Sequence, residues 1–441
     1  MSQEWRSTLY VVAPHPTSAR VLLQQQNGRY RLPATTAAGN VWDTGPAAVE
    51  PILRDLMGQD LTVLHRLHYQ ADEARRTGSS VYLVETAGNH LTGQWVDASI
   101  LADLPLDQPE QRSLLATVLE ERVSGPPSGR NPWARPGWQA QVEAWIEAHL
   151  SENGARLLGP LKPVKRWALS CVLEAPTSTG SIYFKTHADL PLFGNEAAVL
   201  DELSRRYPTE IPRPLALERR RIWMLLPPFE EIVGWDASLA QRRALLTRFA
   251  RLQRRAVSDV EPLLRSGCLD RRLDWTAAQI EPLLDQADQF VDAASAARLH
   301  ALAPLLRRAI DALQRLGVPE TLVHGDLHGG NVALRGGQPL YFDWTDACIS
   351  HPFVDLLDVY LEEDEALGQI LRDAYLAEWA DEVDFLDLQA AWPWAEAVAA
   401  LHHTISYVSI VQHVEPGSAY EIDWGPPFWF KRLLSLLEKL T

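Results

Sequence analysis

One stretch constrains the fold of this chain more than any other: it reads His324-Gly325-Asp326-Leu327-His328-Gly329-Gly330-Asn331 and is followed by Tyr341-Phe342-Asp343-Trp344. Asn331 follows Asp326 by five residues, and Asp343 follows Asn331 by 12 (343 − 331). Two short apolar runs around Gly336-Gly337 lie between them, a pattern that predicts a β-hairpin. Because a hairpin brings its ends together, Asn331 and Asp343 should lie side by side as oxygen ligands for a hard cation, with Asp326 facing the space in front of it.

The bulk composition is that of a folded globular protein with more than one domain. A chain of 441 residues is too long for one ordinary core, and its apolar content of 46% and charged content of 22% argue against disorder. The formal net charge is -16. Such a charge argues against nucleic acid or an anionic membrane as the main partner, because both repel an acidic surface.

Cysteine usage and hydropathy indicate a cytoplasmic protein. Cys171, Cys268 and Cys348 are far apart and odd in number, which predicts neither a disulfide framework nor a metal site and favours a reducing compartment. The first residues lack the pattern of a signal peptide. The most apolar long stretch, 390–411, is interrupted by charged and histidine residues, so we expect no membrane span.

A Pro/Gly-rich segment, 124–137, is the clearest linker in the chain. It separates a first domain, 1–123, from a second domain, 138–441. In the second domain strand-like runs, 156–158 among them, dominate up to residue 229, and helical periodicity dominates from 230 to 441. Helices are expected over about 275–291 and 384–407, and Pro393 should kink or split the second of these. The sequence therefore predicts an α+β protein whose second domain has a small β-rich lobe and a larger helical lobe.

Lys185 and Glu196 are the first candidate partners of the opening motif. Lys185 follows the apolar run Ile182-Tyr183-Phe184 in a predicted strand, and Glu196 lies 11 residues later near the start of a predicted helix. A strand lysine paired with a helix glutamate is held where its ammonium group can reach phosphate oxygens. Together with Asp326, Asn331 and Asp343, this pair predicts a nucleotide-binding cleft.

The motif from His324 to Asn331, followed by Phe342-Asp343-Trp344, resembles the aminoglycoside phosphotransferase and choline kinase group of eukaryotic-like kinases, whose pattern is His-Gly-Asp-Leu-His-x-x-Asn and then Asp-Trp or Asp-Phe. The resemblance covers about residues 150–440. It implies a bilobal, protein-kinase-like fold that binds ATP, or another nucleoside triphosphate, together with Mg²⁺. By this resemblance Asp326 is the catalytic carboxylate, Asn331 and Asp343 hold Mg²⁺, and Lys185 and Glu196 serve the nucleotide, whose base should lie near the backbone of Leu225.

The segment expected to cover the phosphates departs from the protein-kinase pattern. It reads Pro160-Leu161-Lys162-Pro163-Val164-Lys165-Arg166-Trp167 and contains no glycine. Lys165, Arg166 and Ser170 could supply hydrogen-bond donors to phosphate. In the opening motif His324 and His328 are expected to brace the loop rather than act as bases, and Asp355, at a predicted helix start, is expected to support the loop by hydrogen bonds.

The acceptor side of the predicted cleft is less defined by the sequence. Asp346 could be a surface charge or a substrate contact. The acidic run 362–365 could attract an amine-bearing substrate, although a solvated helix start explains it more simply. His402, His403 and Tyr407 have helical spacing and could line the acceptor pocket or simply pack.

Residues 1–123 resemble a Nudix domain, a small α/β fold. Arg31-Leu32-Pro33 takes the place of that family's strand, and a helix over about 46–56 ends at Gly58. The Nudix helix carries several carboxylates to hold magnesium at a pyrophosphate. Here Pro51, Ile52 and Leu56 stand at three of those four places and only Asp55 is acidic. The resemblance therefore implies a scaffold or regulatory domain without hydrolase chemistry.

The sequence predicts an ATP-dependent kinase that phosphorylates a hydroxyl group of a small molecule such as an aminoglycoside, choline or a sugar. The alternative is a binding module that senses nucleotide with little turnover, which the intact Asp326 disfavours. A protein substrate is disfavoured too, because the chain reaches His351-Pro352 soon after Asp343 and leaves no room for a long activation segment.

Overall fold

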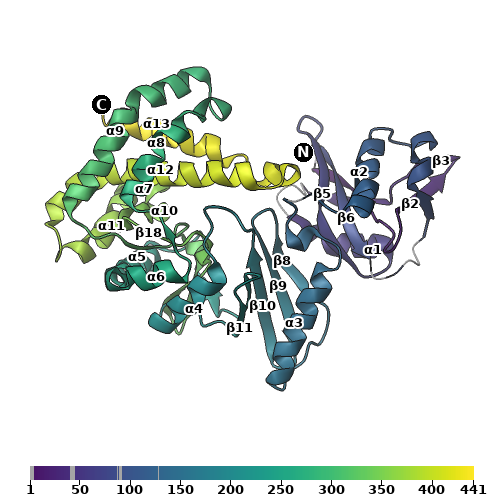
Figure 1. Cartoon of the computed structure of the whole chain (residues 1–441), viewed down its shortest axis with the longest axis horizontal. Helices are drawn as coiled ribbons and strands as arrows, with labels where there is room; N and C mark the ends of the chain where they lie inside the picture. Colours follow the sequence, from purple (N-terminus) through teal and green to yellow (C-terminus); the bar gives the residue numbers. More distant parts are fainter. Residues whose placement is uncertain (1–3, 40–44, 87, 89–91, 128) are drawn as a thin grey trace. The chain divides into compact units, whose positions relative to one another are not determined.

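The computed structural model describes residues 4–39, 45–86, 88, 92–127 and 129–441; Ser128, within the predicted linker, lies outside them. The chain forms two compact units. The first comprises residues 1–180 and 415–419, and the second comprises 181–414 and 420–441. Helices and strands are both abundant in the described residues, which confirms the α+β class (Figure 1). The predicted domain boundaries at 123 and 138 stay a prediction.

The N-terminal part of the first unit is built on a mixed four-stranded sheet in the order β4-β1-β6-β5, in which β1 and β6 run parallel. A second sheet has the order β3-β2-β7. Helix α1 ends at Gly58, whose φ of +65° is the left-handed conformation that favours glycine, as predicted. The Nudix relationship stays a prediction. The elements are β1 (Arg6–Val12), β2 (Arg20–Gln26), β3 (Arg29–Arg31), β4 (Ala34–Ala38), α1 (Gly45–Met57), β5 (Leu61–Asp72), β6 (Thr77–Thr86), β7 (Gln94–Asp97) and α2 (Gln111–Ser124).

Two hydrophobic cores use alternate residues of the same strands. Leu9 and Val11 of β1 pack with Val49 and Leu53 of α1. Val12, whose side chain points to the other face of the strand, packs in the core that contains Leu115 and Leu119 of α2. This is the period-two alternation expected of a sheet that is buried on both faces.

Residues 130–180 add a short 3₁₀ helix, a long helix and a strand pair to the first unit. These are η2 (Pro132–Ala134), α3 (Trp138–Glu152), β8 (Lys162–Arg166) and β9 (Ser170–Thr177), with β8 antiparallel to β9. The loop predicted over 160–167 is therefore mostly strand, and the turn lies at 167–169. Pro163 pairs with Leu173 in the edge strand β8, where a missing N–H can be tolerated. The strand predicted at 156–158 is reduced to a single bridge between Leu157 and Thr177.

A buried ion pair joins α1 to β8 within this unit. Glu50 and Arg166 each have 1% side-chain exposure, and their Oε2 and Nη1 atoms lie 3.5 Å apart. Arg166 also donates to the carbonyl oxygen of Val63 at 2.5 Å and to Gln139 Oε1 at 2.9 Å. Glu50 in turn accepts from the Val63 amide and from Arg54. This network takes up the guanidinium of Arg166, so the suggested role of Arg166 as a phosphate donor is wrong.

Replacing Glu50 by glutamine should destabilise the protein by about 3 kcal/mol, because it leaves the buried Arg166 charge without its partner. Urea unfolding of the full chain measures this change. The double variant Glu50→Gln/Arg166→Met should recover much of the loss, since methionine removes the unpaired charge and fills similar volume. Equal stability of Glu50→Gln and the wild type would contradict the structural importance of the pair.

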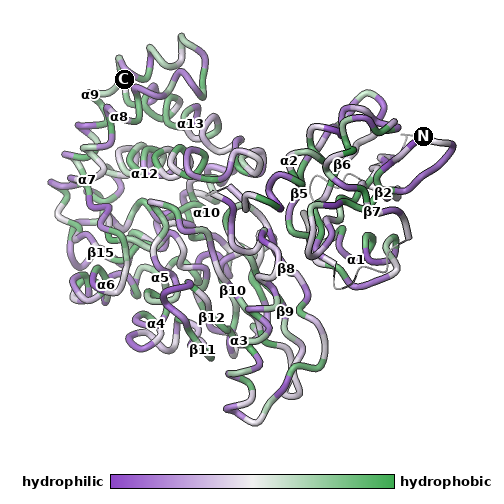
Figure 2. Tube along the Cα trace, turned by 45° about the vertical axis from the view of Figure 1, so that its right-hand side comes forward, coloured by the Kyte–Doolittle hydropathy of each residue, from purple (hydrophilic) through white to green (hydrophobic). Residues whose placement is uncertain are grey.

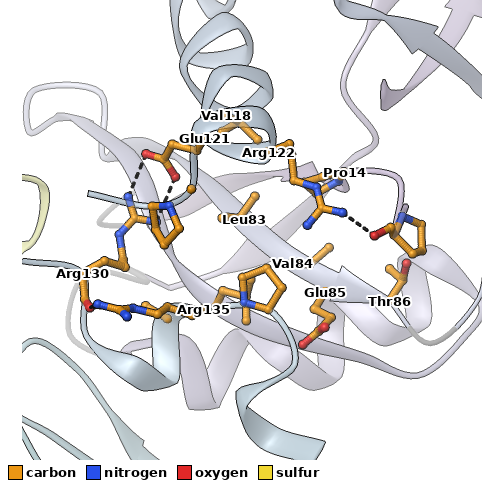
Figure 3. Close-up of a pocket in the computed structure, with 16 residues that line it drawn as sticks. Pro14, Leu83, Val84, Glu85, Thr86, Val118, Glu121, Arg122, Arg130 and Arg135 are labelled. Atoms are coloured by element: carbon orange, nitrogen blue, oxygen red, sulfur yellow. Dashed lines mark hydrogen bonds and ion pairs between the residues drawn. The ribbon is translucent and has the colours of Figure 1, made fainter. Parts of the chain in front are cut away.

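A cavity of about 460 Å³ lies in the first unit between β6, α2 and the segment that follows α2. Figure 3 shows Leu83 and Val84 of β6 on one side of it and Val118 and Arg122 of α2 on another. Arg130 extends toward Glu121 of α2 in the same view and forms an ion pair with it.

The second unit begins with strands and continues with helices. Strands β10 (Gly180–His187), β12 (Trp223–Leu226) and β11 (Ala216–Glu218) are adjacent and antiparallel, and Lys185 pairs with Met224 in this register. Helix α4 (Glu196–Arg206) follows β10 along the chain. Two three-stranded sheets, β13-β16-β17 and β14-β18-β15, are smaller. Their strands are β13 (Glu231–Ile232), β14 (Leu269–Asp270), β15 (Thr321–Val323), β16 (Val332–Arg335), β17 (Gln338–Tyr341) and β18 (Cys348–Ser350).

Most of the predicted helices are present. The helix predicted over 275–291 is broken into shorter pieces, and the helix predicted to be kinked or split at Pro393 is one element, α12. In Figure 1, α13 runs beside α12. The main helices are α5 (Leu239–Ala256), α6 (Val260–Ser266), α7 (Leu273–Ala278), α8 (Ile280–Leu284), α9 (Ala293–Leu316), α10 (Leu357–Tyr360), α11 (Glu365–Leu376), α12 (Phe385–His413) and α13 (Gly425–Lys439).

The core of the second unit is one large hydrophobic cluster to which the strands and most helices contribute. Figure 2 shows hydrophobic and hydrophilic residues alternating along these helices, as expected when one face is buried. None of the helices in the described part of the chain has the length and apolar character needed to cross a membrane.

Candidate active site

Lys185 lies between two carboxylates. Its Nζ atom is 2.7 Å from Glu196 Oε1 and 2.5 Å from Asp343 Oδ1. Lys185 and Glu196 have side-chain exposures of 6% and 2%, whereas Asp343 has 31%. The structure thus brings together three residues that are distant in sequence, and it leaves the Asp343 end of the group open to a ligand.

Glu196 is held from several directions. Its Oε1 accepts a hydrogen bond from the Trp344 amide at 3.0 Å, and its Oε2 accepts one from the Thr345 hydroxyl at 3.1 Å. Its own amide donates to Nε2 of His187, while His187 Nδ1 donates to the Ala188 carbonyl. Burial lowers the pKa of His187, which matches this neutral tautomer. Sequence reasoning missed His187 and Thr345, since neither belongs to a spaced motif.

The predicted hairpin is confirmed. β16 pairs with β17 from Val332↔Tyr341 to Arg335↔Gln338, and its two-residue turn, Gly336-Gly337, has φ of +56° and +75°. Two positive φ angles are the requirement of a type I′ turn. At the open end of the hairpin the Phe342 amide donates to the Asn331 carbonyl at 3.1 Å. Asp343, the next residue, is thereby brought close to Asn331, as the hairpin predicted.

Asp326 contacts Asn331 and His328. Asn331 Nδ2 donates to the Asp326 carbonyl at 2.9 Å and to its Oδ2 at 3.1 Å. His328 Nδ1 accepts from the Gly330 amide at 3.0 Å, which leaves Nε2, 3.5 Å from Asp326 Oδ2, as the protonated nitrogen. Burial acts to raise the pKa of Asp326, but the hydrogen bond and charge of His328 outweigh it and hold that pKa below its ordinary value. Asp326 is therefore an ionised carboxylate at neutral pH.

The loop that carries Asp326 is packed tightly against its neighbours. The ring of His328 stacks on Trp235 with centroids 4.1 Å apart, and the Gly234 amide donates to the Gly329 carbonyl at 2.9 Å. A side chain at Gly329 would collide with the carbonyl oxygen of Gly234. Glycine at this position thus permits the close approach that fixes the loop.

His324 and Asp355 brace the loop, as predicted. His324 Nε2 lies 2.9 Å from the Phe342 carbonyl and donates to it, which ties the loop to the end of the hairpin. The Asp355 carboxylate accepts from the backbone amides of His324 and Gly325, the latter at 3.0 Å. His324 is fully buried, and burial lowers its pKa to about 4. A histidine in this state supports structure rather than acid–base chemistry at neutral pH.

The buried histidines should lower the free energy of unfolding as the pH drops from about 6.5 toward 4. Burial lowers the pKa of His324 and His403 to about 4, and of His65 and His351 to about 3. In that pH range the unfolded chain binds protons that the folded chain does not bind. Each of these histidines therefore lowers the free energy of unfolding by up to about 1.4 kcal/mol for each pH unit of the decrease. Urea unfolding at pH 7, 6 and 5 checks this expectation, and His324→Asn should have a shallower slope. An equal slope in His324→Asn and the wild type would contradict it.

Asn331 and Asp343 suit a hard divalent cation. Since Asn331 Nδ2 is engaged by Asp326, its oxygen is the end that remains for a cation. Asp343 has the unusual φ of +65°, which sets the direction of its carboxylate. In the described residues no group of three or more His, Cys, Asp or Glu side chains is arranged to hold a metal. Two protein oxygens with phosphate oxygens and water are the pattern that Mg²⁺ accepts, so the residues fit it.

The remaining residues that were predicted to contact the nucleotide are Leu225, Lys165 and Ser170. Leu225 of β12 is buried and pairs with Phe184. In the first unit, the Lys165 ammonium lies 4.2 Å from the centre of the Trp167 ring, and the Ser170 hydroxyl accepts from Trp167 Nε1 at 2.8 Å. Contacts of Lys165, Ser170 and Leu225 with a nucleotide stay predictions.

Helix α12 carries His403 and Tyr407. Burial and the charges of Asp326 and Asp346 raise the pKa of Tyr407, so this phenol lies within the field of both carboxylates. His403 stacks on Trp429 with centroids 4.5 Å apart. Tyr407 lies 5.4 Å from Trp424, an indole with 53% exposure. The acidic run is a helix start: Asp364 caps α11 and Glu362 pairs with Arg242 at 2.5 Å.

The site has the parts needed for phosphoryl transfer, and the comparison with known families agrees. Residues 183–402 match the phosphotransferase enzyme family. This segment belongs to that family. The match includes Lys185, Glu196, Asp326, Asn331 and Asp343 and confirms the predicted enzyme class, a small-molecule kinase. No curated protein sequence matches the chain significantly.

Three solved structures are similar to this chain at low identity. A macrolide 2'-phosphotransferase from Brachybacterium faecium is 16% identical, with a TM-score of 0.43, over 63% of this chain and 97% of its own. A spectinomycin phosphotransferase bound to ADP and spectinomycin is 12% identical, with a TM-score of 0.44, over 69% of this chain and 98% of its own. An ethanolamine kinase from Plasmodium vivax is 10% identical, with a TM-score of 0.48, over 77% and 96%.

Proposed function

We propose that the protein transfers the γ-phosphoryl group of ATP, or of another nucleoside triphosphate, to a hydroxyl group of a small molecule. The observation that carries the proposal is the Lys185 ammonium held between Glu196 and Asp343, in the same unit as the Asp326–Asn331 pair. Phosphoryl transfer needs positioning and neutralisation of charge more than covalent chemistry, and this set of residues supplies both.

Each residue has a distinct part in the proposed reaction. Lys185, fixed by Glu196, binds phosphate oxygens, and Asn331 and Asp343 hold Mg²⁺, which neutralises phosphate charge when bound. Asp326 accepts a hydrogen bond from the acceptor hydroxyl and orients its oxygen toward the γ-phosphorus. A bond forms between that oxygen and phosphorus, the bond to the β,γ-bridging oxygen breaks, and the hydroxyl proton passes to Asp326. The products are the phosphate ester and a nucleoside diphosphate.

The acceptor is proposed to lie on the side of Asp326 that faces α12. Burial and the charges of Asp326 and Asp346 raise the pKa of Tyr407. Burial and the charges of Asp326 and Asp343 raise the pKa of Asp346. The charged Asp326, together with Tyr407, whose ring centre lies 5.4 Å from that of the exposed Trp424, suits an acceptor with polar or amino groups. A cytoplasmic location, where nucleoside triphosphates are abundant, goes with this proposal.

The test uses purified full chain with ATP and Mg²⁺. Nucleotide binding should be measurable by calorimetry, and a set of hydroxyl-bearing metabolites should contain at least one that stimulates ADP release. Nucleotide binding without any phosphorylated acceptor would favour the alternative, a nucleotide-sensing module. The absence of binding at millimolar ATP would contradict both.

A further inference from the structure

The cavity between β6 and α2 in the first unit has a volume of about 460 Å³, which is a size typical of small-molecule sites. One wall of it is apolar and is formed by side chains of β5, β6 and α2. These are Leu64, Leu83 and Val118, which share one hydrophobic core and have exposures of 3%, 4% and 3%. The apolar part of a ligand would therefore meet a surface that is already shielded from water.

Three arginines also line the cavity, and one of them is fully compensated by carboxylates. Arg130 has 5% side-chain exposure and forms ion pairs with Glu121 at 3.0 Å and with Glu415 at 2.6 Å. A guanidinium group that already has two carboxylate partners has little to offer a further anion. The cations that matter for a ligand are therefore the other two, Arg122 and Arg135.

Arg122 and Arg135 are held by backbone carbonyl groups within the part of the chain that the structure describes. Arg122 Nη2 donates to the carbonyl oxygens of His15, at 3.0 Å, and Pro16. Arg135 donates through Nε and Nη2 to the Arg130 carbonyl at 2.9 and 2.6 Å. Carbonyl groups orient a guanidinium without neutralising its charge. Figure 3 shows the two side chains coming from different elements, Arg122 from α2 and Arg135 from the segment after it.

Both guanidinium groups keep donors for a ligand. Arg122 Nε is buried and has no hydrogen-bond partner among the described residues. Arg135 uses Nε and Nη2 for its contact with the protein, which leaves Nη1. A buried donor without an acceptor is unfavourable, and hydrogen bonds between guanidinium and an anionic oxygen are strong. An anion in this cavity would therefore gain hydrogen bonds as well as charge pairing.

The remaining carboxylate of the lining limits the charge of that anion. Glu85 lines the cavity, and its Oε1 accepts a hydrogen bond from the Gly137 amide at 2.8 Å. One carboxylate beside two uncompensated cations leaves a single positive charge for a ligand. A carboxylate monoanion satisfies this balance, whereas a phosphate ester with about two charges exceeds it. A planar carboxylate also matches the fork of a guanidinium group.

We propose that this cavity binds a small organic acid with an apolar body. The carboxylate of the ligand pairs with Arg122 and Arg135, and its apolar part packs on the wall formed by β5, β6 and α2. The residues proposed for phosphoryl transfer all belong to the second unit, so this site is separate from them. It gives the N-terminal part of the chain a ligand-binding role that goes beyond the proposed function and does not depend on it.

The test measures binding of straight-chain acids, from butyrate to octanoate, to the full chain by calorimetry. Affinity should rise about three- to fourfold for each added CH₂ group, because each group is removed from water at the apolar wall. Octanamide, the uncharged analogue, should bind at least about tenfold more weakly than octanoate, because it cannot pair with the two guanidinium groups. Both comparisons use the wild type and so do not depend on the folding of a variant.

Variants then assign the binding to the two arginines. Arg122→Gln and Arg135→Gln should each weaken octanoate binding by about tenfold, the effect of one charge-assisted hydrogen bond. Arg122→Lys keeps the charge and should retain more affinity than Arg122→Gln. The control is Arg75→Gln in the same unit, because the Arg75 side chain has 82% exposure and lies outside the cavity. Thermal midpoints identify any variant that does not fold.

Hydrogen exchange of the wild type locates the ligand. Octanoate should slow exchange in peptides that span 81–86 and 115–126, and it should leave peptides of the second unit unchanged. Equal affinities for octanoate and octanamide, or affinities of both glutamine variants equal to that of Arg75→Gln, would overturn the proposal. Tighter binding of octyl phosphate than of octanoate would overturn the choice of a carboxylate. None of these results bears on phosphoryl transfer, which is tested with MgATP.

Discussion

Replacing Asp326 by asparagine should lower kcat by about three orders of magnitude and leave nucleotide affinity within about twofold. Asparagine has the same size and can keep the contact with Asn331 Nδ2, so the loop should stay in place. The change removes the ionised oxygen that orients the acceptor hydroxyl and takes its proton. The lowered pKa of Asp326 means that this oxygen is charged at neutral pH in the wild type.

The measurement is ADP release with a saturating acceptor, alongside calorimetry of MgATP binding. Glu363→Gln is the control, because it removes one exposed carboxylate elsewhere in the same unit. Its kcat should match that of the wild type. An Asp326→Asn enzyme that retains more than a tenth of wild-type kcat would show that another group serves the acceptor.

Replacing Asp343 by alanine should abolish the Mg²⁺ dependence of nucleotide binding and lower affinity by roughly 100-fold, since the cation loses its one charged protein ligand in the proposed set. Lys185 would keep its 2.7 Å contact with Glu196, so the fold around the lysine should survive. The loss should therefore appear in binding and turnover rather than in stability.

A magnesium titration at fixed ATP separates this effect from general damage. Wild-type affinity should rise as Mg²⁺ is added, and Asp343→Ala should give a flat response. Glu363→Gln, which removes an exposed carboxylate elsewhere in the same unit, is the control and should keep the Mg²⁺ response. A normal magnesium response in Asp343→Ala would exclude Asp343 as a ligand.

Much of the site could be predicted because its chemistry is encoded in short spacings. The pair Gly336-Gly337 between two apolar runs was enough to predict the hairpin that brings Asn331 to Asp343, and the structure confirms it. The strand and helix that carry Lys185 and Glu196 were also visible as local patterns, and the ion pair between them is present. Local pattern and contact agree here because each element is short and strongly specified.

The contacts that were missed join residues far apart in sequence. Arg166 and Glu50 are separated by 116 positions, and Asn131 and Ala168 by 37, so no periodicity links them. Arg166 was wrongly considered as a hydrogen-bond donor to phosphate, because the local sequence around this arginine does not show that it pairs with Glu50 in the core. Pro163 also made β8 look like a loop, although an edge strand accepts proline.

The continuity of α12 has a related explanation. Pro393 removes one backbone hydrogen bond and favours a break, which is why a kink or split was predicted. The helix nevertheless runs from Phe385 to His413, with Trp392, Ala395 and Val398 buried in the core. Burial of this apolar face offsets the lost hydrogen bond, a tertiary effect that local propensity does not contain.

The most direct test of the central claim is transfer of label from [γ-³²P]ATP to a small molecule. The full chain is incubated with Mg²⁺, labelled ATP and a set of hydroxyl-bearing metabolites, in parallel with Asp326→Asn, and the products are separated by chromatography. A labelled small molecule that forms with the wild type and is nearly absent with Asp326→Asn is the expected result. The account is contradicted if the wild type labels no acceptor, or if both proteins label it at the same rate.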